Sequence, residues 1–143
     1  MADVVELIEQ DHRAVEQLFA QFEASKDAAI AERICDKLTT HTRTEESAVY
    51  PVFRDRLSNG KEMIGEAETE HDEARQLIGR VRNTTDPEHL ASLMLDLKQA
   101  IQHHVREEES EILPQARTEM SGAALGELAD QFQAAKQEVA RAR

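Results

Sequence analysis

The chain has 143 residues, about the length of one domain, and a net charge of −12. Such a charge argues against a nucleic-acid backbone or an anionic membrane surface as partner. Only 3% of the residues are aromatic, and five Gly and three Pro are too few for the many tight turns of an all-β sandwich. A single cysteine, Cys35, excludes an internal disulfide framework.

The first residues, MADVVELIEQD, lack the basic and apolar regions of a signal peptide. The sequence also contains no apolar run of about 18 residues, the length that a membrane-spanning helix needs. We therefore expect a cytoplasmic protein that makes no contact with a membrane.

Turn signals and helical periodicity divide the chain into amphipathic helices. At the clearest boundary, Asp86 is placed to cap a helix whose first residue is Pro87. The predicted helices cover residues 2–24, 28–57, 61–82, 87–118 and 123–141. This pattern predicts an all-α fold, an antiparallel up-down-up-down four-helix bundle over 1–120. A short C-terminal helix within 121–143 would pack on the bundle or on a partner, which includes a second copy in a weak homo-oligomer.

An internal repeat relates the two halves of the chain. A shift of 63 residues lays His41 on His104 and Glu45 on Glu108, and a shift of 59 lays His12 on His71. The same shifts align Pro51 with Pro114 and Glu46 with Glu109. The sequence therefore predicts two similar helical hairpins that carry the same polar residues.

The repeated polar residues fall inside the apolar stripes of the four helices, so we expect them to point into the core. They are His12, His41, Glu45, His71, His104 and Glu108. His103 lies about 100° from its helix's stripe and His89 lies outside the repeat, so both are expected on the surface. One such histidine is most simply a core residue satisfied by a glutamate. Six such residues together, two of them carboxylates whose buried charge must be compensated, indicate a metal site. Imidazole and carboxylate suit iron, manganese or zinc.

With these motifs the sequence resembles the hemerythrin-like family, also called HHE cation-binding domains, over about residues 5 to 117. The matching pattern is His12, His41-x-x-x-Glu45, His71 and His104-x-x-x-Glu108, followed by Pro51 and Pro114. The resemblance implies two iron ions, bridged by both glutamates and by an oxo, hydroxo or water ligand. His12 and His41 would bind one iron, and His71 and His104 the other.

The resemblance implies that the small ligand is O2, peroxide or nitric oxide. Oxygen carriers of the family bear a further histidine four residues after the ligand of the third helix, where this chain has Arg75. We therefore favour peroxide decomposition, a catalase-like reaction, over reversible O2 carriage, although the sequence leaves open whether the chain is an enzyme. The alternatives are a non-catalytic iron or oxygen sensor and an iron-handling protein. Repair of iron–sulfur clusters ranks lower because the N-terminal cysteine segment of the repair proteins is absent.

Arg75 and Glu16 are the candidates for an auxiliary role beside the metal, and no catalytic side chain is predicted. The two face inward at corresponding positions of the two hairpins, so an ion pair across the core is one interpretation. Two others are that each extends outward to solvent, and that Glu16 binds iron.

A ferritin-like di-iron carboxylate site is a further alternative, because Glu9 and Glu68 precede His12 and His71 by three residues. This alternative leaves His41 and His104 without a role.

Three other features have simpler interpretations. Tyr50 lies about 180° around the helix from His41, so we expect it to pack at the end of the bundle. Cys35 is expected to be a small buried apolar residue. The acidic run Glu107-Glu108-Glu109 is expected to face solvent, except for Glu108.

Overall fold

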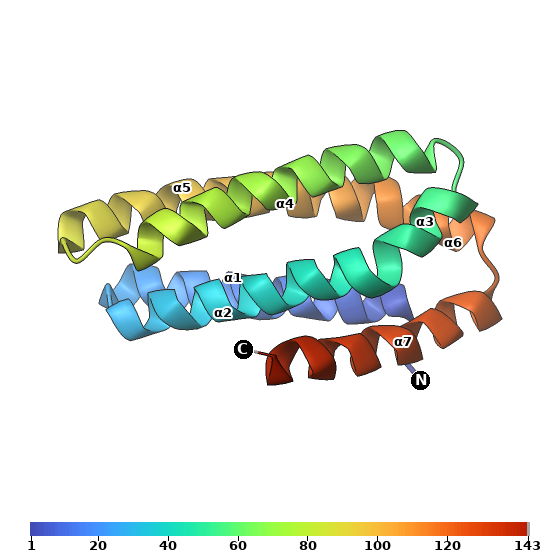
Figure 1. Ribbon diagram of the computed structural model, residues 1–143, viewed down its shortest axis with the longest axis horizontal. Coiled ribbons are helices and arrows are strands. Elements are labelled where there is room, and N and C mark those ends of the chain that lie inside the picture. The colour runs from blue at the N-terminus through green and yellow to red at the C-terminus, as the bar shows by residue number, and fades with distance from the viewer. Residues whose placement is uncertain (143) are drawn as a thin grey trace.

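The computed structural model describes residues 1–142 and confirms the all-α fold, a four-helix bundle with an additional C-terminal helix (Figure 1). The α-helices are α1 (Val4–Ser25), α2 (Ala28–Thr44), α3 (Tyr50–Arg56), α4 (Gly60–Arg82), α5 (Pro87–Glu107), α6 (Leu113–Glu119) and α7 (Gly122–Arg141). Two π-helical turns, η1 (Glu45–Val49) and η2 (Glu108–Ile112), connect α2 to α3 and α5 to α6. Arg143 lies outside the described residues.

The helix starts follow from local capping. Asp3 and Glu6 form a capping box at the start of α1, and Asp86 accepts the backbone N–H of His89 at the start of α5. Pro87 occupies the first turn of α5, as predicted.

The two π turns are the main departure from the predicted elements, which run as continuous helices over 28–57 and 87–118. In each π turn a backbone N–H bonds the carbonyl five residues earlier, from Tyr50 to Glu45 and from Leu113 to Glu108. A proline, Pro51 or Pro114, follows directly and lacks the N–H that would continue the α-helical ladder. The π turns therefore lie at the glutamates of the two His-x-x-x-Glu motifs.

The apolar core consists of two clusters separated by a polar layer. One cluster, at the end formed by α3, α6 and α7, includes Tyr50, Phe53 and Phe132. The other, at the opposite end, includes Phe19, Phe22 and Met94. The predicted apolar stripe of the first helix is confirmed, since its residues are all buried: Val5, Ile8, Val15, Phe19 and Phe22. The repeated histidines and glutamates occupy the layer between these clusters.

Helix α7 lies along α1 and α2, on the side of the bundle away from α4 and α5 (Figure 1). It buries Leu125, Leu128, Ala129 and Phe132. None of the helices within residues 1–142 combines the length and apolar character needed to cross a lipid bilayer.

The two hairpins are joined by a tight turn at residues 57–59. Asn59 adopts a left-handed conformation with φ of 56°. Gly60, the first residue of α4, lies against the carbonyl groups of Phe53 and Arg54. A Cβ at Gly60 would collide with both carbonyl oxygens, so only glycine fits this approach.

Candidate metal centre

The structure brings all six predicted residues together in the polar layer. His12, His41, Glu45 and Glu108 each place one nitrogen or oxygen within 4.8 Å of the others, and Glu45, His71 and His104 form a second such group. Every member is at most 4% exposed. Glu45 belongs to both groups, so its carboxylate lies between the two histidine pairs.

The Nε2 atoms of the histidines face the carboxylates. His12 Nε2 lies 3.0 Å from Glu108 Oε1, His41 Nε2 lies 3.1 Å from Glu45 Oε1, and His71 Nε2 lies 3.3 Å from the same Glu45 oxygen. His71 Nε2 and His104 Nε2 are 3.2 Å apart.

These inward atoms fit a bound cation better than they fit one another. Four buried atoms make no well-aligned hydrogen bond in the described chain, although three of them belong to the ion-pair contacts above: His12 Nε2, His41 Nε2, Glu45 Oε2 and Glu108 Oε1. A buried polar atom is normally paired, and these four are the donor types that transition metals bind. The arrangement therefore fits a metal site on its own geometry.

A carboxylate outside the centre orients each of the four imidazoles. In the first hairpin, His12 Nδ1 lies 2.7 Å from Glu109 and His41 Nδ1 lies 2.8 Å from Asp11. In the second, His71 Nδ1 lies 2.7 Å from Glu46 and His104 Nδ1 lies 2.7 Å from Glu70. An Nδ1–H that donates to a carboxylate leaves Nε2 as the atom with a free lone pair. This is the usual orientation of metal-binding histidines.

These four carboxylates were not among the predicted site residues, and the expectation that Glu109 faces solvent is wrong, because Glu109 bonds His12. Their signal was present in the repeat. The residue after each motif glutamate is acidic (Glu46 and Glu109), and so is the residue before each lone histidine (Asp11 and Glu70). Glu109 and Glu46 reach across to the other hairpin, whereas Asp11 and Glu70 serve a histidine of their own hairpin.

Tyr50 is a second residue of the site that sequence reasoning misplaced. Its hydroxyl lies 2.5 Å from Glu108 Oε2, 3.3 Å from Glu45 Oε1 and 3.3 Å from His71 Nε2. In the π turn, residues five apart lie one above the other, so the Tyr50 hydroxyl points the same way as Glu45, while its ring packs in the apolar cluster at the bundle end as expected. The repeat places Leu113 at the corresponding position of the second hairpin, so the site carries one tyrosine.

The charges of the centre stabilise one another when no metal is bound. Burial opposes ionisation of Glu45, but His41, His104 and His71 hold the pKa of its carboxyl well below the usual range. Burial also opposes the charge on His41, yet Glu45 and Asp11 raise its pKa from 6.5 to about 10. In the metal-free protein His41 is therefore protonated near neutral pH, and a metal that binds there must displace the proton.

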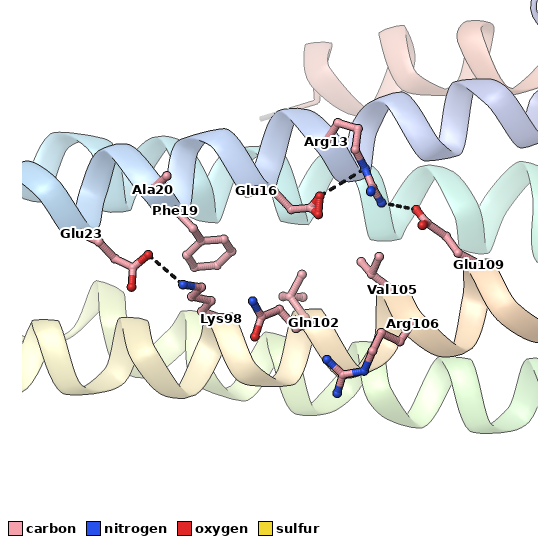
Figure 2. A pocket seen from close by; sticks show the side chains of 11 residues that line it. Arg13, Glu16, Phe19, Ala20, Glu23, Lys98, Gln102, Val105, Arg106 and Glu109 are labelled. Atoms are coloured by element: carbon pink, nitrogen blue, oxygen red, sulfur yellow. Dashed lines mark hydrogen bonds and ion pairs between the residues drawn. The ribbon is translucent and has the colours of Figure 1, made fainter.

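The ion pair proposed between Glu16 and Arg75 is not formed. Arg75 bonds Glu46 and Asp72, on the outer side of the centre. Glu16 pairs with Arg13 at 3.1 Å, beside the groove between α1 and α5, and lies outside both metal-binding groups (Figure 2). A Glu16–Arg75 ion pair across the core would be less favourable than the observed pairs. Each residue has an oppositely charged partner nearer to solvent, where less desolvation is needed.

Three cations lie behind the orienting carboxylates. Lys136 of α7 bonds Asp11, Arg75 bonds Glu46, and Arg13 lies 2.5 Å from Glu109. Figure 2 shows Arg13 between Glu16 and Glu109. Phe132 of α7 also contacts the His41 ring, with ring centroids 6.4 Å apart. The C-terminal helix therefore touches the centre through a cation and an aromatic ring.

A small enclosed cavity borders the centre on the side of His12 and His41. Its apolar lining consists of Val15, Leu38, Ile101 and Val105, and His12, His41 and His104 also line it. The space admits about one water-sized molecule. This small space therefore lies beside His12, His41 and His104, whereas the Tyr50 hydroxyl lies beside His71.

The other sequence alternatives lie away from the centre. Glu68 pairs with Arg54 at 2.8 Å, and the convergent groups found in residues 1–142 include neither Glu68 nor Glu9, as a ferritin-like site would need. His89 is exposed, as expected. Cys35 is fully buried, as expected, and burial raises the pKa of its thiol to about 11.

Comparisons with known proteins support the fold. A crystal structure of a Hemerythrin HHE cation binding domain-containing protein, the Rv2633c homolog from Mycobacterium kansasii, superposes with a TM-score of 0.83. It covers 99% of this chain and 90% of that chain at 20% identity, which supports the fold. A protein named DNA nickase from Nostoc sp. (strain PCC 7120 / SAG 25.82 / UTEX 2576) is 27% identical over 96% of this chain. The chain spans 40% of that relative's length.

The family model of the Hemerythrin HHE cation binding domain matches residues 3–116. The match covers the four-helix bundle and all six residues of the two convergent groups. On this evidence the chain belongs to the hemerythrin HHE cation-binding domain family.

Proposed function

We propose that the chain binds two iron ions in the polar layer and decomposes peroxide there, with O2 and nitric oxide as related ligands. The observation that carries the proposal is the set of buried Nε2 and carboxylate oxygen atoms, backed by imidazoles that outer carboxylates orient. Imidazole nitrogens and carboxylate oxygens that converge in one buried layer are the donor types that transition metals bind.

The two convergent groups suggest how the ions would be shared. His12 and His41 would hold one ion, and His71 and His104 the other, with Glu45 and Glu108 between them. Bound iron would supply the redox change that peroxide decomposition requires. Manganese or zinc suits the same donors, but zinc has no redox chemistry.

The chain's own residues would prepare the site for a small ligand. The apolar side chains of Val15, Leu38, Ile101 and Val105 limit the space beside His12 and His41 to about one water-sized molecule. The Tyr50 hydroxyl donates to Glu108 across an oxygen–oxygen distance of 2.5 Å. Burial and the nearby carboxylates raise the pKa of this phenol well above its usual value. Tyr50 therefore remains a neutral hydrogen-bond donor, which suits the stabilisation of a carboxylate in a buried site.

A non-catalytic sensor is the second candidate, and the contacts of α7 favour it. Lys136 bonds Asp11 and Phe132 contacts the His41 ring. Binding or loss of a metal or small ligand at the centre would therefore alter how α7 packs on the bundle. The name of the Nostoc relative raises nucleic acid as a partner. The net charge of −12 argues against that, because phosphate binding relies on basic residues.

Metal analysis followed by a peroxide assay tests the proposal. Protein loaded anaerobically with ferrous iron should hold about two irons per chain and release oxygen steadily from hydrogen peroxide. Glu45→Ala should lose both irons because this residue belongs to both groups, whereas Glu9→Ala should keep them. Two irons without turnover would favour the sensor, and a chain that retains no iron would refute the di-iron assignment.

A further inference from the structure

The four carboxylates that orient the histidines differ in what lies behind them. Three of them contact a side chain that is cationic near neutral pH. These pairs are Asp11 with Lys136, Glu46 with Arg75 and Glu109 with Arg13. Behind the fourth, Glu70, lie a histidine and a second carboxylate, His103 and Glu107.

These three side chains converge at the surface, outside the metal centre. His103 Nε2 lies 3.2 Å from Glu70 Oε2 and 3.2 Å from Glu107 Oε1. All three ligand atoms lie within 4.8 Å of one another. His103 and Glu107 are one turn apart on α5, and Glu70 comes from α4. A tetrahedral ion with bonds of about 2.0–2.2 Å would separate its ligand atoms by about 3.3–3.5 Å, so little movement is needed to admit one.

Glu70 and Glu107 both lie within reach of the same His103 nitrogen. The cluster is open to solvent, because the His103 side chain is 56% exposed and that of Glu107 is 35% exposed. An ion would therefore have access and room for water ligands.

We propose that Glu70, His103 and Glu107 bind a divalent transition-metal ion at the surface of the bundle. Mixed imidazole and carboxylate donors suit Fe²⁺, Mn²⁺ or Zn²⁺ and disfavour Mg²⁺, which prefers oxygen and water. The other oxygen of Glu70 lies 2.7 Å from His104 Nδ1, so the ion would be one carboxylate away from a histidine of the centre. The ion would place a positive charge beside Glu70, as Lys136 does beside Asp11.

A manganese titration of the full chain tests this site, because free Mn²⁺ gives a strong electron paramagnetic resonance signal that binding reduces. The protein is first loaded with iron, so that the central groups are filled, and Mn²⁺ is then added. The parent should bind about one Mn²⁺ that Zn²⁺ displaces and equal Mg²⁺ does not. Loss of an outer partner alone weakens metal binding roughly 10–100-fold. His103→Ala with Glu107→Gln should therefore weaken this Mn²⁺ by at least about tenfold.

His89→Ala is the matched control, since His89 is an exposed histidine on the same helix, and it should bind Mn²⁺ as the parent does. Circular dichroism checks that each variant keeps the fold. Equal Mn²⁺ binding by the parent and the double variant would overturn the proposal. Iron content is measured on the same samples. A chain that takes up no iron, yet loses a Mn²⁺ site in the double variant, would contradict the di-iron proposal alone and support the surface site.

Discussion

Replacing Tyr50 by Phe removes one hydroxyl from the centre without leaving a cavity, because the ring is fully buried and Phe retains it. The hydroxyl donates to Glu108 at 2.5 Å and lies 3.3 Å from Glu45, and both acceptors are buried carboxylates. A hydrogen bond to a charged group contributes about 1.5–3 kcal/mol, so we expect metal-free Tyr50→Phe to lose about 2 kcal/mol of unfolding free energy. Given about 2–4 °C per kcal/mol for domains slightly longer than this one, the melting temperature should fall by roughly 4–8 °C.

Urea denaturation of the metal-free proteins measures this loss, and a double-mutant cycle with Glu108→Gln assigns it. The coupling between Tyr50 and Glu108 should reach about 1 kcal/mol, since residues in one hydrogen-bond network couple by about 0.5–3 kcal/mol. Thr44→Val is the matched control, because Thr44 is fully buried and donates to the backbone carbonyl of Thr40, a neutral acceptor. That change should lower stability by only about 0.5–1.5 kcal/mol. Identical urea curves for the parent and Tyr50→Phe would show that the hydroxyl does not support the buried carboxylates.

Three further predictions concern the outer carboxylates, pH and α7. Glu109→Gln should weaken iron binding roughly 10–100-fold in a chelator competition, because His12 loses its orienting partner, whereas the exposed neighbour change Glu111→Gln should leave affinity unaltered. The folded pKa of His41, about 10, exceeds its ordinary 6.5, so the stabilisation from its charge is complete below pH 6.5 and is lost toward pH 10. Urea curves of the metal-free protein across that interval should therefore move to lower midpoints as pH rises, and constant midpoints would contradict this. Phe132→Ala should lower the unfolding free energy by about 3–5 kcal/mol, and Leu95→Ala, at a 51% exposed position, should not; equal losses would place Phe132 outside the core.

The sequence predicted the inward histidines and glutamates because two independent patterns coincide on them. Helical spacing places them in the apolar stripes, and the repeat duplicates them in the second hairpin. The orienting acids repeat as well, as Asp11 with Glu70 and Glu46 with Glu109. An acidic residue on a helix is usually solvated, however, so only the packing of neighbouring helices, within a hairpin and between the two, reveals what these four bind.

The position of Tyr50 depends on backbone geometry that a uniform helical period does not contain. At 100° per residue Tyr50 faces away from His41, but the π turn takes one more residue per turn and brings it back over Glu45. The recurring Pro51 and Pro114 mark both π turns in the sequence. The sequence left the position of Arg75 open for a different reason. Its preferred partner, Glu46, lies on a neighbouring element, and the helical wheel of its own helix carries no information about it.

The exchange of carboxylates between the hairpins makes each half of the chain a specific partner for the other. Glu109 serves His12, and Glu46 serves His71. Hairpins from two separate chains would satisfy the same contacts, and this is the route to a domain-swapped dimer. The turn at Gly60 opposes that exchange, because its backbone fits closely onto the carbonyl groups of Phe53 and Arg54. A side chain at this position would push the hinge open, so the smallest residue of the turn keeps both halves of the site in one molecule.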